Sequence, residues 1–101
     1  MYNKITMEIK NIQFIQSILE ESDVEFAGIF GSCAEGVATH DSDLDLLVRF
    51  KKPVSLSRFT QLQKKLSEKL QIPVDLVTEQ SLSPYFKEEV LKNIQVVYGA
   101  R

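Results

Sequence analysis

The sequence is poor in the residues and runs that mark several large classes of protein. Its 101 residues include one cysteine, one histidine and no tryptophan. No apolar run approaches the roughly 20 residues that a membrane helix needs. A single cysteine excludes a disulfide framework within the chain and fits a reducing compartment. The first residues lack the apolar core of a signal peptide, so we expect a cytoplasmic protein that does not associate with membranes.

The charge balance and the length are ordinary for a small globular domain. Lys and Arg number 12 against 14 Asp and Glu, for a net charge of -2, and 44% of the residues are hydrophobic. These values argue against disorder and against a coiled coil. A chain of this length is expected to form one domain, residues 1–101, that buries about 65% of the surface exposed when unfolded. So small a domain cannot enclose a ligand alone.

The hydrophobic pattern predicts helices and strands in a mixed order. Apolar residues at helical spacing predict helices over residues 7–21, 56–70 and 84–94. Short apolar or alternating runs predict strands over residues 24–30, 42–50 and 74–78, with an added edge strand over 95–98. Ser83 followed by Pro84 is typical of a helix start. We therefore expect an α+β fold in which helices pack on a small mixed β-sheet.

Charges are segregated along the chain. Every charged residue between positions 20 and 45 is acidic, whereas between positions 49 and 70 only Glu68 is acidic. Two solvated surfaces of opposite sign account for most of these residues. The acids at positions 41–45 fit that interpretation poorly.

Asp43 and Asp45 are the first candidates for chemistry. Alternation along the predicted strand puts Leu44 and Leu46 on one face and the two aspartates on the other, about 6.6 Å apart along the backbone. Carboxylates so close repel each other unless one is protonated or a cation lies between them. Their hard oxygen ligands favour Mg²⁺ or Mn²⁺. Alone, an Asp-x-Asp pair is a weak signal.

Asp75 interrupts an otherwise apolar predicted strand, where an unpaired charge is expensive to bury. If this strand neighbours the strand of Asp43 and Asp45, the three carboxylates form a cluster that could hold metal ions. The alternative is that Asp75 points to solvent or pairs with a lysine of the preceding helix.

A turn with two glycines, residues 31–36, follows the first predicted strand. Gly31 tolerates a tight bend, and Ser32 can cap a following turn whose free N–H groups hold an anion such as a phosphate. Beside a carboxylate cluster, this turn would place a phosphate next to a metal.

The run FGSCAEGVATHDSDLDLLV, with Asp75 on a later strand, resembles the signature of the DNA polymerase beta-like nucleotidyltransferases. The short chain looks like the minimal branch of that superfamily. The resemblance implies a nucleotidyltransferase fold in which Asp43, Asp45 and Asp75 are catalytic and bind Mg²⁺ or Mn²⁺. Gly31 and Ser32 would hold the β- and γ-phosphates of ATP. Minimal members commonly pair with a small all-helical HEPN-type protein as toxin and antitoxin, so AMP transfer to a hydroxyl of that partner is implied.

One departure from the signature bears on activity. Glu35 stands where many relatives have an arginine, and an acid there opposes triphosphate binding. Arg49, on the predicted face of the aspartates, and Lys51 or Lys52 are candidates to compensate. The alternative function is a weakly active or inactive module that neutralises a helical partner by contact alone. The acidic net charge disfavours nucleic acid as a partner.

Overall fold

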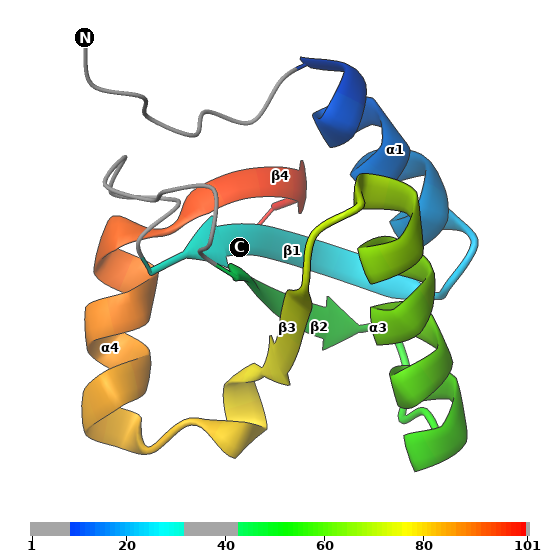
Figure 1. Ribbon diagram of the computed structural model, residues 1–101. Coiled ribbons are helices and arrows are strands. Elements are labelled where there is room, and N and C mark those ends of the chain that lie inside the picture. The colour runs from blue at the N-terminus through cyan, green and yellow to red at the C-terminus, as the bar shows by residue number, and fades with distance from the viewer. Residues whose placement is uncertain (1–8, 32–42, 101) are drawn as a thin grey trace, which may run out of the picture.

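The computed structural model describes residues 9–31 and 43–100, and its elements follow the predicted order. These are α1 (Ile9–Glu20), β1 (Val24–Phe30), β2 (Leu44–Phe50), α3 (Leu56–Leu70), β3 (Val74–Thr78), the 3-10 helix η1 (Glu79–Ser81), α4 (Pro84–Asn93) and β4 (Gln95–Gly99) (Figure 1). The structure differs from the predictions in detail: Asp43 precedes β2, Ile94 follows α4, and η1 was not predicted. The α+β class is confirmed.

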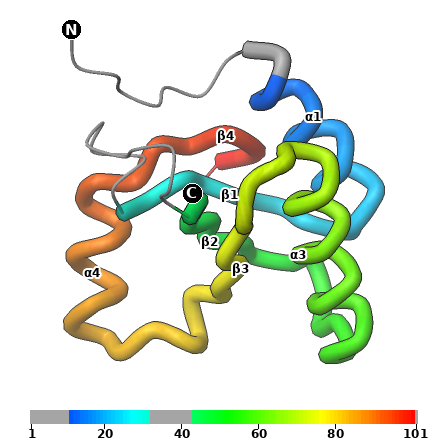
Figure 2. Tube along the Cα trace, viewed as in Figure 1, coloured from blue at the N-terminus to red at the C-terminus, as the bar shows by residue number. Residues whose placement is uncertain are grey.

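The strands form a mixed sheet in the order β3-β2-β1-β4. β1 is antiparallel to both β2 and β4, whereas β2 and β3 are parallel. Parallel neighbours need a crossover connection, which α3 provides between β2 and β3. The trace shows α1 and α3 close together and α4 well apart from them (Figure 2).

α3 has well-defined ends that the sequence encodes. Ser55 is its N-cap, and the Ser55 hydroxyl accepts a hydrogen bond from the Arg58 N–H at 3.2 Å. At the other end, Gln71 adopts a left-handed conformation with φ of 60° and donates its N–H to the Ser67 carbonyl. α4 begins as predicted, with the Ser83 hydroxyl accepting from the Phe86 N–H and with Pro84 in the first turn.

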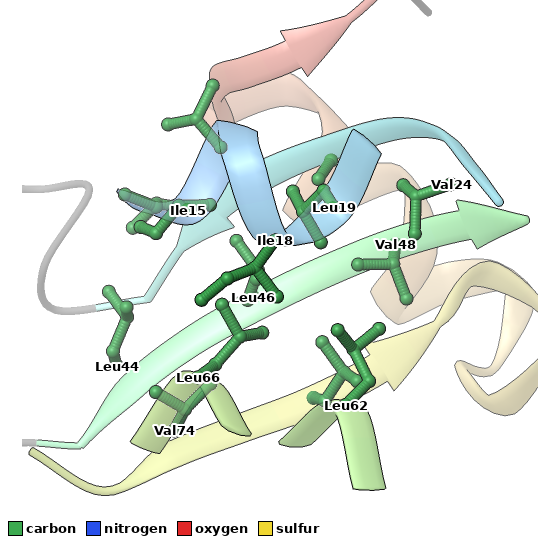
Figure 3. Close-up of a cluster of buried hydrophobic side chains, with 14 of the residues drawn as sticks. Ile15, Ile18, Leu19, Val24, Leu44, Leu46, Val48, Leu62, Leu66 and Val74 are labelled. Atoms are coloured by element: carbon green, nitrogen blue, oxygen red, sulfur yellow. The ribbon is translucent and has the colours of Figure 1, made fainter. Parts of the chain in front are cut away.

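The main core lies between one face of the sheet and the helices α1 and α3 (Figure 3). Residues of α1 such as Ile15 and Leu19 and of α3 such as Leu66 meet the strand residues Leu46 and Val48, all of them fully buried. These positions are those that the helical and alternating patterns assign to the core.

The opposite face of the sheet carries a second, smaller apolar cluster, which the sequence analysis did not anticipate. Its buried members are Phe26, Phe30, Leu47 and Val90. Val90 belongs to α4, so this helix covers part of the face on which the alternation places the aspartates. α4 ends close to β1: a Cβ at Gly28 would lie 2.5 Å from Ile94 Cγ1.

The segregated charges pair with each other in part. Lys65 on α3 lies 3.3 Å from Glu21, and the Asp23 carboxylate lies 3.9 Å from both Lys52 and Arg58. These pairs are exposed, so each adds little stability. No helix within residues 9–31 or 43–100 is long and apolar enough to span a membrane.

Candidate nucleotidyltransferase site

Asp45 lies near the start of β2, between β1 and β3. Its Cα partners are Phe30 on antiparallel β1 and Asp75 on parallel β3. Residues opposite each other in a sheet project from the same face, so Asp45 and Asp75 lie side by side. The condition set for a carboxylate cluster, that the two aspartate-bearing strands are neighbours, is met.

Asp75 is exposed, while its neighbours Val74 and Leu76 are buried in the main core. Alternation therefore sends Asp75 to the face of the sheet opposite α1 and α3. No ion pair among residues 9–31 and 43–100 involves Asp75, so pairing with a lysine of the preceding helix is not seen. Asp75 is therefore both accessible to solvent and adjacent to Asp45.

The electrostatics link all three acids. Partial burial raises the pKa of Asp45, and the negative charges of Asp75 and Asp43 raise it further. Asp43 lies just before β2 and is exposed. A carboxylate destabilised in this way gains from a nearby cation.

The side chains of Asp43, Asp45 and Asp75 do not converge on a single metal position. Within the described residues, no three His, Cys, Asp or Glu side chains stand close enough to hold a metal ion. The backbone nevertheless sets Asp45 directly beside Asp75, and partial burial together with the negative charge of Asp75 raises the pKa of Asp45. Carboxylate oxygens are the donors that Mg²⁺ and Mn²⁺ prefer, so the donor set fits such an ion.

Gly31, the first residue of the predicted phosphate-binding turn over residues 31–36, lies against the Asp45 carboxylate. It follows β1 directly and has a φ of 76°, a left-handed conformation that favours glycine. A Cβ at Gly31 would collide with the Asp45 Oδ2 atom. The chain thus leaves β1 in contact with the Asp45 carboxylate, whereas Ser32 and Glu35 lie outside the described residues.

Arg49 lies on the face of the aspartates, as predicted, but its charge is already engaged. Its Nε is 2.7 Å from Glu25 Oε2, at an angle outside hydrogen-bond geometry, and its Nη1 is 3.3 Å from Glu79 Oε1. Nη2 donates to the Ala100 carbonyl at 3.0 Å, and the guanidinium lies 5.1 Å from the centre of the Phe26 ring. Arg49 therefore links Glu25, Glu79 and Ala100 at the far end of β2. The hypothesis that it compensates for Glu35 finds no support in this geometry.

The family profile described as "Polymerase beta, Nucleotidyltransferase" matches residues 13–101, which is most of the chain and includes all three aspartates. The chain belongs to this nucleotidyltransferase family. The resemblance inferred from residues 30–48 and Asp75 is therefore confirmed.

Two relatives of this nucleotidyltransferase can be aligned with nearly its whole sequence. The protein adenylyltransferase MntA of Thermococcus cleftensis is 37% identical over 100 residues, covering 91% of this chain and 99% of the relative. A protein of Methanocaldococcus jannaschii, provisionally named a protein adenylyltransferase, is 35% identical over 94 residues, covering 90% of this chain and 96% of that protein.

Solved structures confirm the nucleotidyltransferase fold. One provisionally named a minimal nucleotidyltransferase is 33% identical, with a TM-score of 0.79 that covers 89% of this chain and 94% of the other. A chain from a toxin-antitoxin complex with AMP-PNP is 25% identical, with a TM-score of 0.79 that covers 90% of this chain and 75% of that one.

Sequence reasoning missed two features of this nucleotidyltransferase site. The first is the packing of α4, a predicted helix, on the face of the aspartates, where Val90 and Leu47 are buried in one cluster. The sequence signals only that Leu47, an apolar residue on an otherwise polar face, requires a cover, and it does not say which element provides it. The second is the pairing of Arg49 with Glu25 and Glu79. The sequence offers no signal for it, since both partners are remote from Arg49 along the chain.

Proposed function

We propose that this chain is a Mg²⁺-dependent protein adenylyltransferase that transfers AMP from ATP to a hydroxyl group of a small all-helical HEPN-type toxin and so acts as the antitoxin. The adjacency of Asp45 and Asp75, with Gly31 against the Asp45 carboxylate, carries the proposal. Support comes also from the protein adenylyltransferase relatives and from the toxin-antitoxin complex with AMP-PNP. The single cysteine fits a reducing cytoplasmic setting.

We assign the metal-binding roles to Asp43, Asp45 and Asp75. A divalent cation bound there would neutralise charge on the triphosphate and on the entering and leaving oxygens. Asp45, whose pKa is raised by burial and by the charges of Asp75 and Asp43, would be held ionised by that cation. Asp75 is the more accessible of the paired aspartates, so its carboxylate can accept the proton of the attacking hydroxyl.

Gly31 and Ser32 would bind the β- and γ-phosphates. The left-handed turn at Gly31 lets the backbone approach the triphosphate beside Asp45. The partner's hydroxyl oxygen then attacks the α-phosphorus, a new O–P bond forms, and the bond to the β-phosphate oxygen breaks in line. Pyrophosphate leaves. The residues of this chain contribute mainly position and charge.

A second function is supported by Glu35, which stands where an arginine would assist the nucleotide. In that case the chain binds and neutralises its partner without turnover. Retention of Asp43, Asp45 and Asp75 favours the enzyme, because clustered acids repel each other without a cation.

Incubation of the chain and its HEPN-type partner with Mg²⁺ and ATP labelled at the α-phosphate tests the proposal. We expect label on the partner from the wild-type chain and none from Asp43→Asn. Label undiminished by Asp43→Asn contradicts the assigned site. Tight partner binding without measurable Mg·ATP binding in calorimetry selects the binding module.

A further inference from the structure

The face of the sheet that carries the aspartates ends, at the far end of β2, beside a group of cationic side chains. Asp45 and Asp75 form one row across β2 and β3, and Leu47 with Val77 forms the next row. α4 covers this apolar middle through Val90. Arg49 follows two residues beyond Leu47, so the basic end begins about 13 Å from Asp45 along β2.

A groove with a volume of about 760 Å³ lies at this basic end. It runs between the end of β2, the segment leading into α3, and the start of η1. Its charged lining residues are Arg49, Lys51, Lys52, Lys87 and Glu79. The groove is therefore basic, although the chain as a whole has a net charge of -2.

The cations of the groove divide into two groups. Arg49 and Lys87 both contact Glu79, at 3.3 Å and 3.4 Å, and so are largely neutralised. Lys51 and Lys52 are exposed, and Lys52 has only a distant contact, 3.9 Å from Asp23. These two lysines supply the positive charge that an incoming ligand meets.

The groove also has an apolar side. Leu56, the first residue of α3, is 80% exposed and lies beside Phe59. The Phe59 and Phe50 rings pack edge to face with centroids 6.4 Å apart, so they form a fixed apolar floor. Neither ring is exposed enough to serve as a stacking platform for a base.

We propose that this groove binds an acidic segment of the partner protein, with an apolar side chain of that segment against Leu56 and Phe59 and its carboxylates against Lys51 and Lys52. Charge complementarity and the exposed leucine support a protein ligand. A nucleic acid would use the lysines but not Leu56, and the acidic chain would repel it.

The location explains how so small a chain could position an acceptor. The groove lies at the end of β2 away from Asp45, where Arg49 of the aspartate face and Leu56 and Phe59 of the α3 side both line it. A partner held there sits at the end of the sheet and can extend along the face that carries Asp45 and Asp75. This inference rests on the proposed function only in identifying the partner as the AMP acceptor. Docking would then raise affinity for the acceptor without touching the reacting atoms.

The test measures binding of the HEPN-type partner by calorimetry, with all variants carrying Asp43→Asn so that no transfer occurs. We expect Leu56→Ala to weaken binding about tenfold, as for loss of one apolar anchor. Lys51→Glu with Lys52→Glu should weaken binding by more than about tenfold. Raised salt should weaken partner binding by the parent more than partner binding by the variants. In chains that keep Asp43, these groove substitutions should leave Mg·ATP affinity unchanged.

The matched control is Lys64→Glu with Lys92→Glu, which alters net charge equally but lies outside the groove. Equal weakening by the control, or unchanged binding by the groove variants, overturns the proposal. The proposal is also overturned if the chain binds a labelled single-stranded RNA, Lys51→Glu with Lys52→Glu abolishes that binding, and Leu56→Ala leaves it intact. Absence of any binding by the parent refutes both the groove and the partner assignment. Binding with no AMP transfer by the chain without Asp43→Asn refutes only the proposed reaction.

Discussion

Asp45 and Asp75 are register partners on parallel strands, and burial on the other side of the sheet holds that register. Val74 and Leu76 flank Asp75 and are buried in the main core. A slip of β3 by one residue would turn Asp75 into that core and expose both apolar side chains. The pairing of the two carboxylates therefore follows from the packing of the fold.

Asp75→Asn is expected to lower AMP transfer about a thousandfold, because a metal-bound carboxylate cluster contributes several kcal/mol to transition-state stabilisation. The fold should be unaffected, since Asp75 is exposed. Initial rates with α-labelled ATP measure the effect. Glu88→Gln, an exposed acid on α4, is the control and should transfer AMP normally.

Asp45→Asn should stabilise the chain at pH 7 when divalent cations are removed. Burial and the charges of Asp75 and Asp43 raise the pKa of Asp45 above its ordinary 3.8, so the folded state loses stability as the pH rises through the raised value. The advantage of the variant should vanish below the ordinary pKa, where both states are protonated. Urea denaturation with EDTA across this range measures it, and a less stable variant at pH 7 would contradict the electrostatic assignment.

Added Mg²⁺ should raise the urea midpoint of the wild type more than that of Asp45→Asn, because binding to the folded state alone stabilises it. An equal rise in both proteins would place the ion elsewhere.

Gly31→Ala should reduce stability by about 1–2 kcal/mol, because an alanine resists the left-handed conformation. Its Cβ would also collide with the Asp45 carboxylate, so ATP affinity should fall in parallel. Denaturation and calorimetry measure the two effects. Gln71→Gly makes the opposite change at another left-handed position, φ of 60°, and should stabilise the chain. Tolerance of alanine at position 31 with full ATP affinity would refute the role of this turn.

Arg49→Met should cost about 1–3 kcal/mol of stability, because it leaves Glu25 and Glu79 without their shared partner and removes a cation from the Phe26 ring. ATP affinity should be unchanged. Lys51→Met, at an exposed neighbouring position, should change stability by less than about 0.5 kcal/mol. If Arg49→Met weakens ATP binding at unchanged stability, Arg49 serves the nucleotide after all.

Much of the site follows from the sequence because its signals are local. The alternation around Leu44 to Val48 assigns each side chain to a face, and the glycine at position 31 marks the turn. Local signals also place the start of α4 at Ser83 and Pro84. The ends of the elements follow less closely from the sequence: the pattern extends a strand through Asp43, which lies outside β2.

The sequence by itself determined the elements, the face that each residue occupies and the residue types available for metal and phosphate, because these depend on periods of two or 3.6 residues. Tertiary structure alone decided that β3 lies beside β2 with Asp75 at Asp45, that α4 covers Leu47, and that Arg49 is held by Glu25 and Glu79. These contacts join segments remote along the chain. They are set by how the whole core packs, which no local pattern encodes.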